Sequence, residues 1–126
     1  MIGYCLVGTN NKEAAEGFYD ALFELLGLKR LNISERVTLW SKAPGQPMFG
    51  IAIPFDGNAA TVGNCTMAAL QVDTPAIVDA LHAKALELGG KDEGATGPRA
   101  GGRMYFGYFR DLDGNKLAVY CPAPKD

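Results

Sequence analysis

The chain has few of the residues that disulfide-rich, zinc-binding or nucleic-acid-binding proteins need. Its 126 residues include three cysteines, Cys5, Cys65 and Cys121, an odd number without Cys-x-x-Cys spacing. That pattern argues against a disulfide framework or a structural zinc site. Acidic and basic residues are interspersed, and a formal net charge of -2 leaves no basic surface for nucleic acid. We therefore expect free thiols and no nucleic-acid partner.

The sequence also lacks a long apolar run. The segment from Met1 to Gly8 has no charged leader followed by such a run, so we expect neither a secretion signal nor a membrane span. The protein is accordingly predicted to be cytoplasmic, with no membrane partner. What the chain does have is a hydrophobic content of 48%, enough for the core of one compact domain over residues 1–126.

The first half of the chain reads as a strand, a helix and three further strands. Ile2 to Gly8 is a short apolar strand, Asn10 or Asn11 supplies a helix cap, and Gly27 suits the end of that helix. The helix is marked by an apolar stripe at three- and four-residue spacing: Ala14, Phe18, Leu22, Leu25 and Leu26. Three strand-like runs follow it, at Leu28 to Ile33, Arg36 to Ser41 and Met48 to Phe55.

The same order of elements then starts again. Cys65 to Val72 is strand-like, and Thr74-Pro75 combines an N-cap hydroxyl with a proline at the first helical position. The glycine-rich segment from Gly94 to Gly102 is expected to be a lid or a long mobile connection. A strand from Arg103 to Arg110 follows it. The repetition predicts two βαβββ modules, about 1–60 and about 61–126, and an α+β fold.

The most specific feature is the segment from Tyr105 to Cys121, which predicts a β-hairpin turning at Asp113-Gly114. This segment consists of an aromatic strand followed by Arg-Asp-x-Asp-Gly-Asn and then by x-Leu-x-Val. It resembles the closing hairpin of the glyoxalase / bleomycin resistance protein / extradiol dioxygenase superfamily, also called the vicinal oxygen chelate proteins. The resemblance implies two modules that form a curved, mostly antiparallel sheet with the helices outside and a cleft inside. Members of this superfamily often dimerise, so the resemblance also implies a homodimer.

In the metal-dependent members of this superfamily, the residue three after the turn asparagine is a metal-binding glutamate. Here that position is Ala118, and the resemblance places the ligand positions of the first strands on Tyr4 and Met67. The last strand of module one, Met48 to Phe55, contains no Asp, Glu, His, Asn or Gln in any register. A catalytic divalent ion needs three or four oxygen or nitrogen ligands. We therefore predict no metal site and no cofactor.

Aromatic and cationic side chains are left to line the cleft. We predict five ligand-binding residues: Tyr4, Trp40, Met67, Arg103 and Tyr105. Arg103 and Tyr105 share one face of their strand and Phe106 and Tyr108 the other, and a bulge would exchange the two assignments. The alternative is that about half of these side chains belong to the core. No catalytic residue is identified.

His82 is assigned a structural or surface role because a single imidazole without carboxylate or cysteine partners makes no site. Asp111 and Asp113 are expected to set the hairpin turn.

Three functions remain open. The first is a metal-free protein that binds a small organic molecule. The second is a divalent-metal-dependent lyase or dioxygenase of the same superfamily. The third is a metal-free enzyme that uses Tyr4 or Arg103 for acid–base or electrostatic catalysis.

Overall fold

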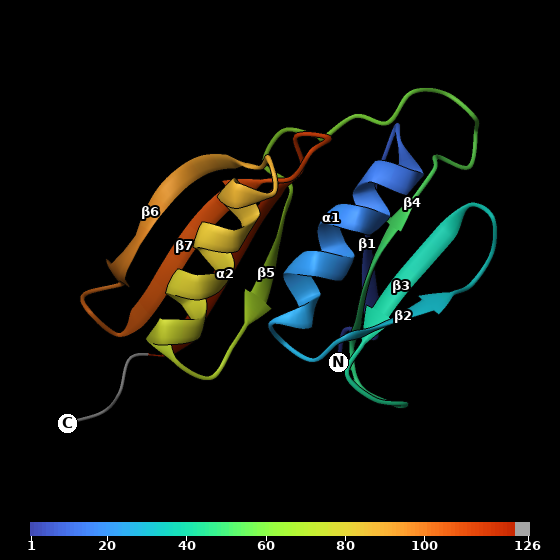
Figure 1. Ribbon diagram of the computed structural model, residues 1–126. Coiled ribbons are helices and arrows are strands. Elements are labelled where there is room, and N and C mark those ends of the chain that lie inside the picture. Colours follow the sequence, from blue (N-terminus) through green and yellow to red (C-terminus); the bar gives the residue numbers. More distant parts are fainter. Residues whose placement is uncertain (123–126) are drawn as a thin grey trace. The chain divides into compact units, whose positions relative to one another are not determined.

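The computed structural model describes residues 1–122, and the chain divides into two compact units, Met1–Asn64 and Cys65–Asp126. We call them module one and module two. Each contains one helix and a four-stranded mixed sheet in the order βαβββ (Figure 1). The predicted α+β fold with two βαβββ modules is confirmed, with the strands arranged as two separate sheets, one in each module.

Module one contains β1 (Tyr4–Gly8), α1 (Lys12–Glu24), β2 (Lys29–Asn32), β3 (Val37–Ser41) and β4 (Met48–Ala52). Its sheet has the order β1-β4-β3-β2. β1 runs parallel to β4, whereas the β4–β3 and β3–β2 pairs are antiparallel. The first strand of the module, β1, therefore lies at one edge of the sheet, beside the last strand, β4.

Helix α1 begins and ends where the sequence predicts. The side-chain oxygen of Asn11 accepts a hydrogen bond from the backbone N–H of Ala14 at 3.1 Å, and Gly27 adopts a left-handed φ of 69° just beyond the helix. One face of α1 packs on the sheet through an aromatic core. Its members are Tyr19 and Phe23 of α1, Trp40 of β3 and Phe49 of β4, with ring centres 5.0 to 5.8 Å apart.

Module two repeats this plan with β5 (Met67–Gln71), α2 (Pro75–Glu87), β6 (Lys91–Arg99), β7 (Met104–Arg110) and β8 (Lys116–Pro122). The order of its sheet is β5-β8-β7-β6, with β5 parallel to β8. The hydroxyl of Thr74 accepts from the N–H of Ile77 at 3.2 Å, and Pro75 opens α2, as the sequence predicts. Val78, Leu81 and Ala85 of α2 are fully buried.

The glycine-rich segment does not form the long loop expected between Gly94 and Gly102. Most of it is strand β6, which pairs with β7 through two register shifts, and only residues 100–103 remain as a turn. The glycines permit close contacts within this strand. A Cβ atom at Gly94 would lie 2.9 Å from Cδ2 of Tyr108, so only a residue without a side chain leaves room for that ring.

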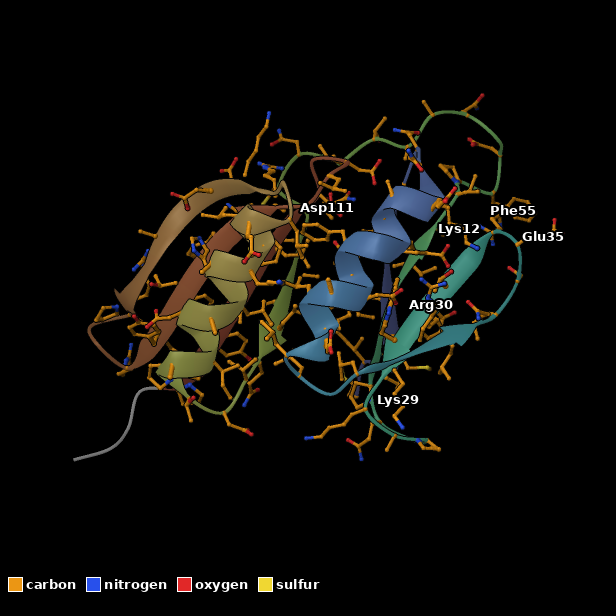
Figure 2. All side chains as sticks on the ribbon, in the orientation of Figure 1. Lys12, Lys29, Arg30, Glu35, Phe55 and Asp111 are labelled. Carbon is orange, nitrogen blue, oxygen red and sulfur yellow. The ribbon has the colours of Figure 1, made fainter. Side chains whose placement is uncertain are left out.

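The hairpin between β7 and β8 turns through a five-residue loop from Asp111 to Asn115. One carboxylate oxygen of Asp111 accepts from the backbone N–H groups of Asp113 and Asn115, each at 2.9 Å, and the other accepts from the amide of Asn115 at 3.0 Å. Asp111 is buried at the end of β7 (Figure 2). Its expected role in setting the turn is confirmed, and the loop it organises fixes the register of the two strands.

Candidate functional site

In each module the helix covers one face of the sheet, and we call the other face the open face. In module two the helix face is identified by two contacts with α2. The hydroxyl of Tyr105 donates to Asp79 of α2 at 2.7 Å, and a Cβ at Gly107 would lie 3.2 Å from the ring of His82. Because side chains alternate along a strand, Phe106 and Tyr108 lie on the open face.

A row of three aromatic rings occupies this open face. Phe106 lies between the other two, stacked on Tyr108 at 5.4 Å and on Tyr120 at 4.9 Å, with interplanar angles of 10° and 12°. Tyr120 comes from β8, where it pairs with Phe106 across the sheet. All three residues are only half-buried, and the hydroxyl of Tyr120 donates to Gln71 of β5 at 3.2 Å. The row therefore offers aromatic surface to a ligand.

Basic side chains surround the Tyr108 end of the row. Nζ of Lys116 lies 5.4 Å from the centre of the Tyr108 ring, and Cζ of Arg99 lies 5.8 Å from it. Both distances are typical of cation–π contacts. Arg110, further along β7, donates to Glu93 at 2.9 Å, and this hydrogen bond and the charge of Arg110 lower the pKa of Glu93. The face therefore combines aromatic and cationic groups.

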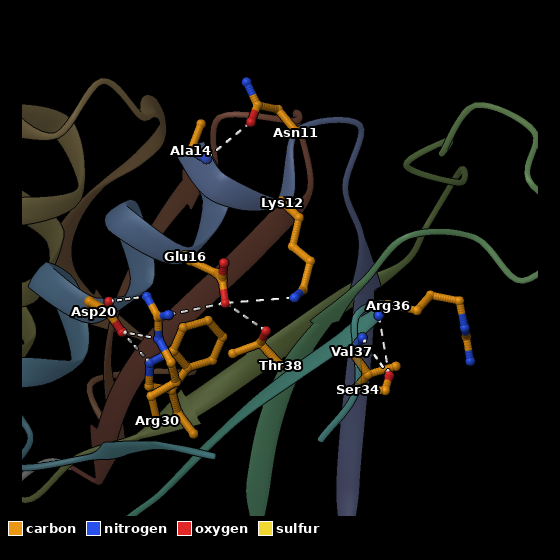
Figure 3. A network of polar contacts seen from close by, with 11 residues as sticks. Asn11, Lys12, Ala14, Glu16, Asp20, Arg30, Ser34, Arg36, Val37 and Thr38 are labelled. Atoms are coloured by element: carbon orange, nitrogen blue, oxygen red, sulfur yellow. Dashed lines mark hydrogen bonds and ion pairs between the residues drawn. The ribbon is translucent and has the colours of Figure 1, made fainter. Parts of the chain in front are cut away.

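Trp40 does not lie where the sequence suggested. It is 1% exposed, packs against Tyr19 and Phe23 of α1, and donates its indole N–H to Asp20 at 2.9 Å. Figure 3 shows the polar network around Asp20, beside α1. Trp40 thus belongs to the helix face and to the core of module one, and we leave it out of the candidate site.

Tyr105 and Arg103 are also placed differently from the expectation. Tyr105 points toward α2, to which it is tied through Asp79, so it is absent from the open face. Arg103 is exposed in the turn between β6 and β7, where its Nε donates to the carbonyl of Ala100 at 3.0 Å. Alternation along β7 allowed either Arg103 and Tyr105 or Phe106 and Tyr108 to line the cleft. The structure places Phe106 and Tyr108 on the open face.

Tyr4 and Met67 do lie on open faces, one in each module. They are the first residues of β1 and β5, and they are 56% and 45% exposed. In module one the neighbouring open-face residues are aliphatic. Leu39 reaches over Gly50, since a Cβ at Gly50 would lie 2.2 Å from Cδ2 of Leu39 and 2.8 Å from Cδ2 of Leu6.

His82 has the structural role that was predicted, but the expectation that it has no carboxylate partner was wrong, because Asp92 of β6 lies beside it. Its ring is buried, and Nε2 lies 3.1 Å from a carboxylate oxygen of Asp92 and 3.1 Å from the carbonyl oxygen of Tyr108. It therefore ties α2 to β6 and β7 on the helix face. A backbone hydrogen bond from Gly94, with a smaller contribution from His82, lowers the pKa of Asp92.

The three cysteines are free thiols in the described chain, Cys121 buried and Cys5 and Cys65 exposed. Desolvation raises the pKa of Cys5 and of Cys121, which disfavours a reactive thiolate at either position.

Comparison with known proteins supports the fold. A crystal structure of a glyoxalase/bleomycin resistance protein from Albidiferax ferrireducens matches with a TM-score of 0.88 and 33% sequence identity, over 96% of this chain and 98% of that chain. The chain belongs to the glyoxalase/bleomycin resistance family, within the superfamily that also contains dioxygenases. No family model and no curated protein matches it.

Two further solved structures of this superfamily share the fold at lower identity. One is a glyoxalase/bleomycin resistance protein/dioxygenase family enzyme from Burkholderia phytofirmans, with a TM-score of 0.75 and 19% identity over 95% of this chain and 97% of that chain. The other is a lactoylglutathione lyase from Agrobacterium tumefaciens, with a TM-score of 0.68 and 21% identity over 96% of this chain and 92% of that chain. At these identities the likeness concerns the fold alone.

In the metal-dependent superfamily members that this chain resembles, the metal ligands come from the first and last strands of each module, and the strand register shows which residues occupy those positions here. Met67 starts β5 and Ala69 pairs with Ala118; in module one Tyr4 starts β1 and Leu6 pairs with Gly50 in the same register. Gly50 is therefore the counterpart of Ala118. A glycine, an alanine, a thioether and a phenol do not fit a divalent cation that prefers imidazole or carboxylate ligands.

No group of three or more His, Cys, Asp or Glu side chains within residues 1–122 is arranged to hold a metal ion. No helix in this part of the chain is both long and apolar enough to cross a membrane.

Three residues of the open face were not among the predicted ligand-binding residues: Tyr120, Lys116 and Arg99. The sequence indicates two of them by their spacing from Ala118. Lys116 and Tyr120 lie two residues before and two residues after Ala118, so alternation places them on the same face as the metal-ligand position of the family.

Proposed function

We propose that this member of the glyoxalase/bleomycin resistance family binds a small organic molecule on the open face of its sheet without using a metal ion. The observation that carries the proposal is the row of Tyr108, Phe106 and Tyr120, half-buried and stacked in parallel. Tyr120 of this row lies on β8, two residues from Ala118, which occupies a metal-ligand position of the metal-dependent superfamily members. Small-molecule sites are typically apolar and aromatic with a few well-placed polar groups.

The donor set at the four strand positions also supports a binding role. A metal-dependent lyase or dioxygenase polarises adjacent oxygen atoms of its substrate with a divalent ion. Tyr4, Gly50, Met67 and Ala118 supply no imidazole or carboxylate for that ion.

We also propose a cytoplasmic location and a homodimer. Exposed apolar side chains on the open face of module one, Tyr4 and Leu6, favour self-association, which light scattering measures.

A thermal-shift screen of aromatic metabolites and antibiotics, carried out with chelator-treated protein, tests the binding proposal. We expect hits that raise the melting temperature equally with and without added divalent metal. Each hit is then incubated with the protein and analysed for turnover, which separates a binding protein from a metal-free enzyme. Hits that appear only after Ni²⁺, Zn²⁺ or Fe²⁺ is added would contradict the proposal.

Two neighbouring aromatic residues of β7 provide a matched pair for locating the site. Phe106→Leu removes a ring from the open face, whereas Tyr105→Leu removes one from the helix face. Loss of stacking is worth about 0.5–1.5 kcal/mol, so Phe106→Leu is expected to weaken binding of a hit by up to about tenfold. Tyr105→Leu should lower stability without this loss of affinity. A larger effect of Tyr105→Leu on affinity would place the ligand elsewhere.

A further inference from the structure

We infer that the ligand of module two is a planar aromatic molecule that carries a negative charge. This inference rests on the proposed function and names the class of ligand. Three features of the open face support it: the charges around Tyr108, the hydroxyl of this residue and the orientation of the three stacked rings.

The basic side chains near Tyr108 are available to an anion. Among residues 1–122, neither Lys116 nor Arg99 forms an ion pair, and both lie over the Tyr108 ring. The Arg99 guanidinium is held by the carbonyl oxygens of Pro98 at 3.0 Å and Ala95 at 2.8 Å, so its position is fixed before a ligand arrives. A fixed guanidinium loses less conformational entropy when it binds a carboxylate or phosphate.

The remaining charges on this face leave it cationic. Arg110 is neutralised by Glu93, whose carboxylate also feels the charge of Lys116. Arg110 and Glu93 line a pocket together with Lys91, Asp111 and Asp113. In the described part of the chain, this end of module two therefore carries the four cations Lys91, Arg99, Arg110 and Lys116 and the three carboxylates Glu93, Asp111 and Asp113, an excess of one positive charge. A ligand anion would offset this imbalance, whereas a ligand cation would increase it.

The hydroxyl of Tyr108 adds a polar group to the same end of the row. The hydroxyl of Tyr105 donates to Asp79, and the hydroxyl of Tyr120 donates to Gln71. The hydroxyl of Tyr108, in contrast, has no hydrogen-bond partner in residues 1–122. A phenol hydroxyl both donates and accepts. It can therefore donate to a ligand oxygen held by Lys116 and Arg99.

The stacked rings favour a flat partner. Side chains of a strand stand roughly perpendicular to the sheet, so three parallel rings present their edges outward. Ring edges are electropositive and ring faces electronegative, and an aromatic ligand lying on this row makes edge-to-face contacts. Exposed Met67 and Ala69 on β5 extend the surface with apolar atoms at its side.

A matched pair of probes separates charge from shape. Naphthoate and naphthalene carboxamide have the same ring system, but only naphthoate is an anion. We expect titrations monitored by amide NMR to show perturbations of residues in β7 and β8. A charge-assisted contact is about twice as strong as a neutral one, so naphthoate should bind roughly tenfold more tightly than the carboxamide.

Two lysine variants provide the control. Lys116→Gln should remove most of the preference for naphthoate and leave carboxamide binding unchanged. Lys84→Gln changes the net charge equally but lies on α2, the helix that covers the other face, and should leave both affinities unchanged. The amide spectrum of each variant shows whether it is folded.

Equal binding of the two probes, or no effect of Lys116→Gln, would overturn the inference about charge. Failure of both probes to bind at millimolar concentration would overturn it as well. None of these results affects the proposed function if hits from the screen still bind more weakly to Phe106→Leu than to the wild type. If the probes fail to bind and Phe106→Leu also leaves the affinity for every hit unchanged, the open face of module two is not the binding site.

Discussion

Ala100 and Cys65 are the non-glycine residues with a left-handed backbone in residues 1–122, with φ of 54° and 67°. Ala100 is followed by Gly101 and Gly102, both also left-handed, and together they form the turn between β6 and β7. The N–H of Gly102 donates to the carbonyl of Arg99 at 3.1 Å, which closes the turn. Glycine adopts this conformation freely, whereas a Cβ atom makes it costly.

Replacing Ala100 with glycine should therefore stabilise the protein. Relief of the left-handed strain is worth about 1–2 kcal/mol, and the additional freedom of glycine in the unfolded chain costs about 0.4–1 kcal/mol. We expect a net gain of roughly 0.5 kcal/mol in the free energy of unfolding, measured by chemical denaturation. Ala59→Gly, in an exposed loop without positive φ, should lower stability instead. A loss at Ala100 would show that the turn is not strained.

The polar contacts of α1 fasten the helix to the edge of its sheet. Asp20 accepts hydrogen bonds from Arg30 of β2 and from the indole N–H of Trp40 in β3. Glu16, one turn earlier, accepts from the hydroxyl of Thr38 at 2.8 Å and pairs with Arg30 at 3.2 Å (Figure 3). Burial opposes ionisation of Asp20, but the bonds from Arg30 and Trp40 and the charge of Arg30 lower its pKa.

This lowered pKa predicts how the contribution of Asp20 depends on pH. The ordinary value is 3.8, so the stabilisation by ionised Asp20 is fully present above that pH and is lost as the pH falls through the lower folded-state value. Asp20→Asn should destabilise the protein by about 1 kcal/mol or less at neutral pH, because Arg30 is partly exposed. Denaturation curves at several pH values should show the difference shrinking below pH 3.8.

Glu24→Gln, at an exposed position of the same helix, is the control for that comparison and should show little change across the series. A difference between wild type and Asp20→Asn that grows as the pH falls would contradict the assignment.

The order and type of the elements could be predicted from the sequence because caps and periodicity are local. Asn11, Thr74-Pro75 and the apolar stripes each act within a few residues of the helix they define. Strand β6 escaped prediction because glycine has low strand propensity, and the close approach of Tyr108 that requires Gly94 involves a different strand.

The length of the hairpin loop decides which residues of β7 lie on the open face. A two-residue turn at Asp113-Gly114 would have paired Ala118 with Phe109, whereas the five-residue loop pairs it with Tyr108. A shift of one residue moves every side chain to the opposite face. Alternation alone therefore could not choose between Tyr105 and Tyr108. Trp40 was misplaced for a similar reason, since nothing in its strand marks which face meets α1.

The two modules have the same plan but different open faces. In module one that face is aliphatic around Leu6, Leu39 and Gly50, whereas in module two it carries aromatic and basic residues. Ala118 and Gly50 occupy equivalent positions in the two sheets. The absence of carboxylates at both positions raises the question of whether restoring one residue would restore a metal site.

We expect that it would not. Ala118 is fully buried, and Ala118→Glu would place a carboxylate in a site without ligands at Tyr4, Gly50 and Met67 to share a cation. An unpaired buried charge should lower the free energy of unfolding by several kcal/mol, at least about 2. Elemental analysis after addition of Ni²⁺ or Zn²⁺ should find no stoichiometric metal.

Ala69→Glu is the matched control for this substitution. Ala69 pairs with Ala118 across the sheet but is exposed, so its glutamate stays hydrated and should change stability by less than about 0.5 kcal/mol. Stoichiometric metal in Ala118→Glu would show that other side chains complete a coordination sphere.

Each module closes its own sheet and its own core, which has an evolutionary consequence. Because the strands of the two sheets are not hydrogen-bonded to each other, a substitution on the open face of one sheet leaves the strand register of the other unchanged. Aromatic and basic residues can then accumulate on the open face of module two while the open face of module one stays aliphatic around Leu6 and Leu39. A gene of this kind offers natural selection two sheets on which a new chemical preference can arise.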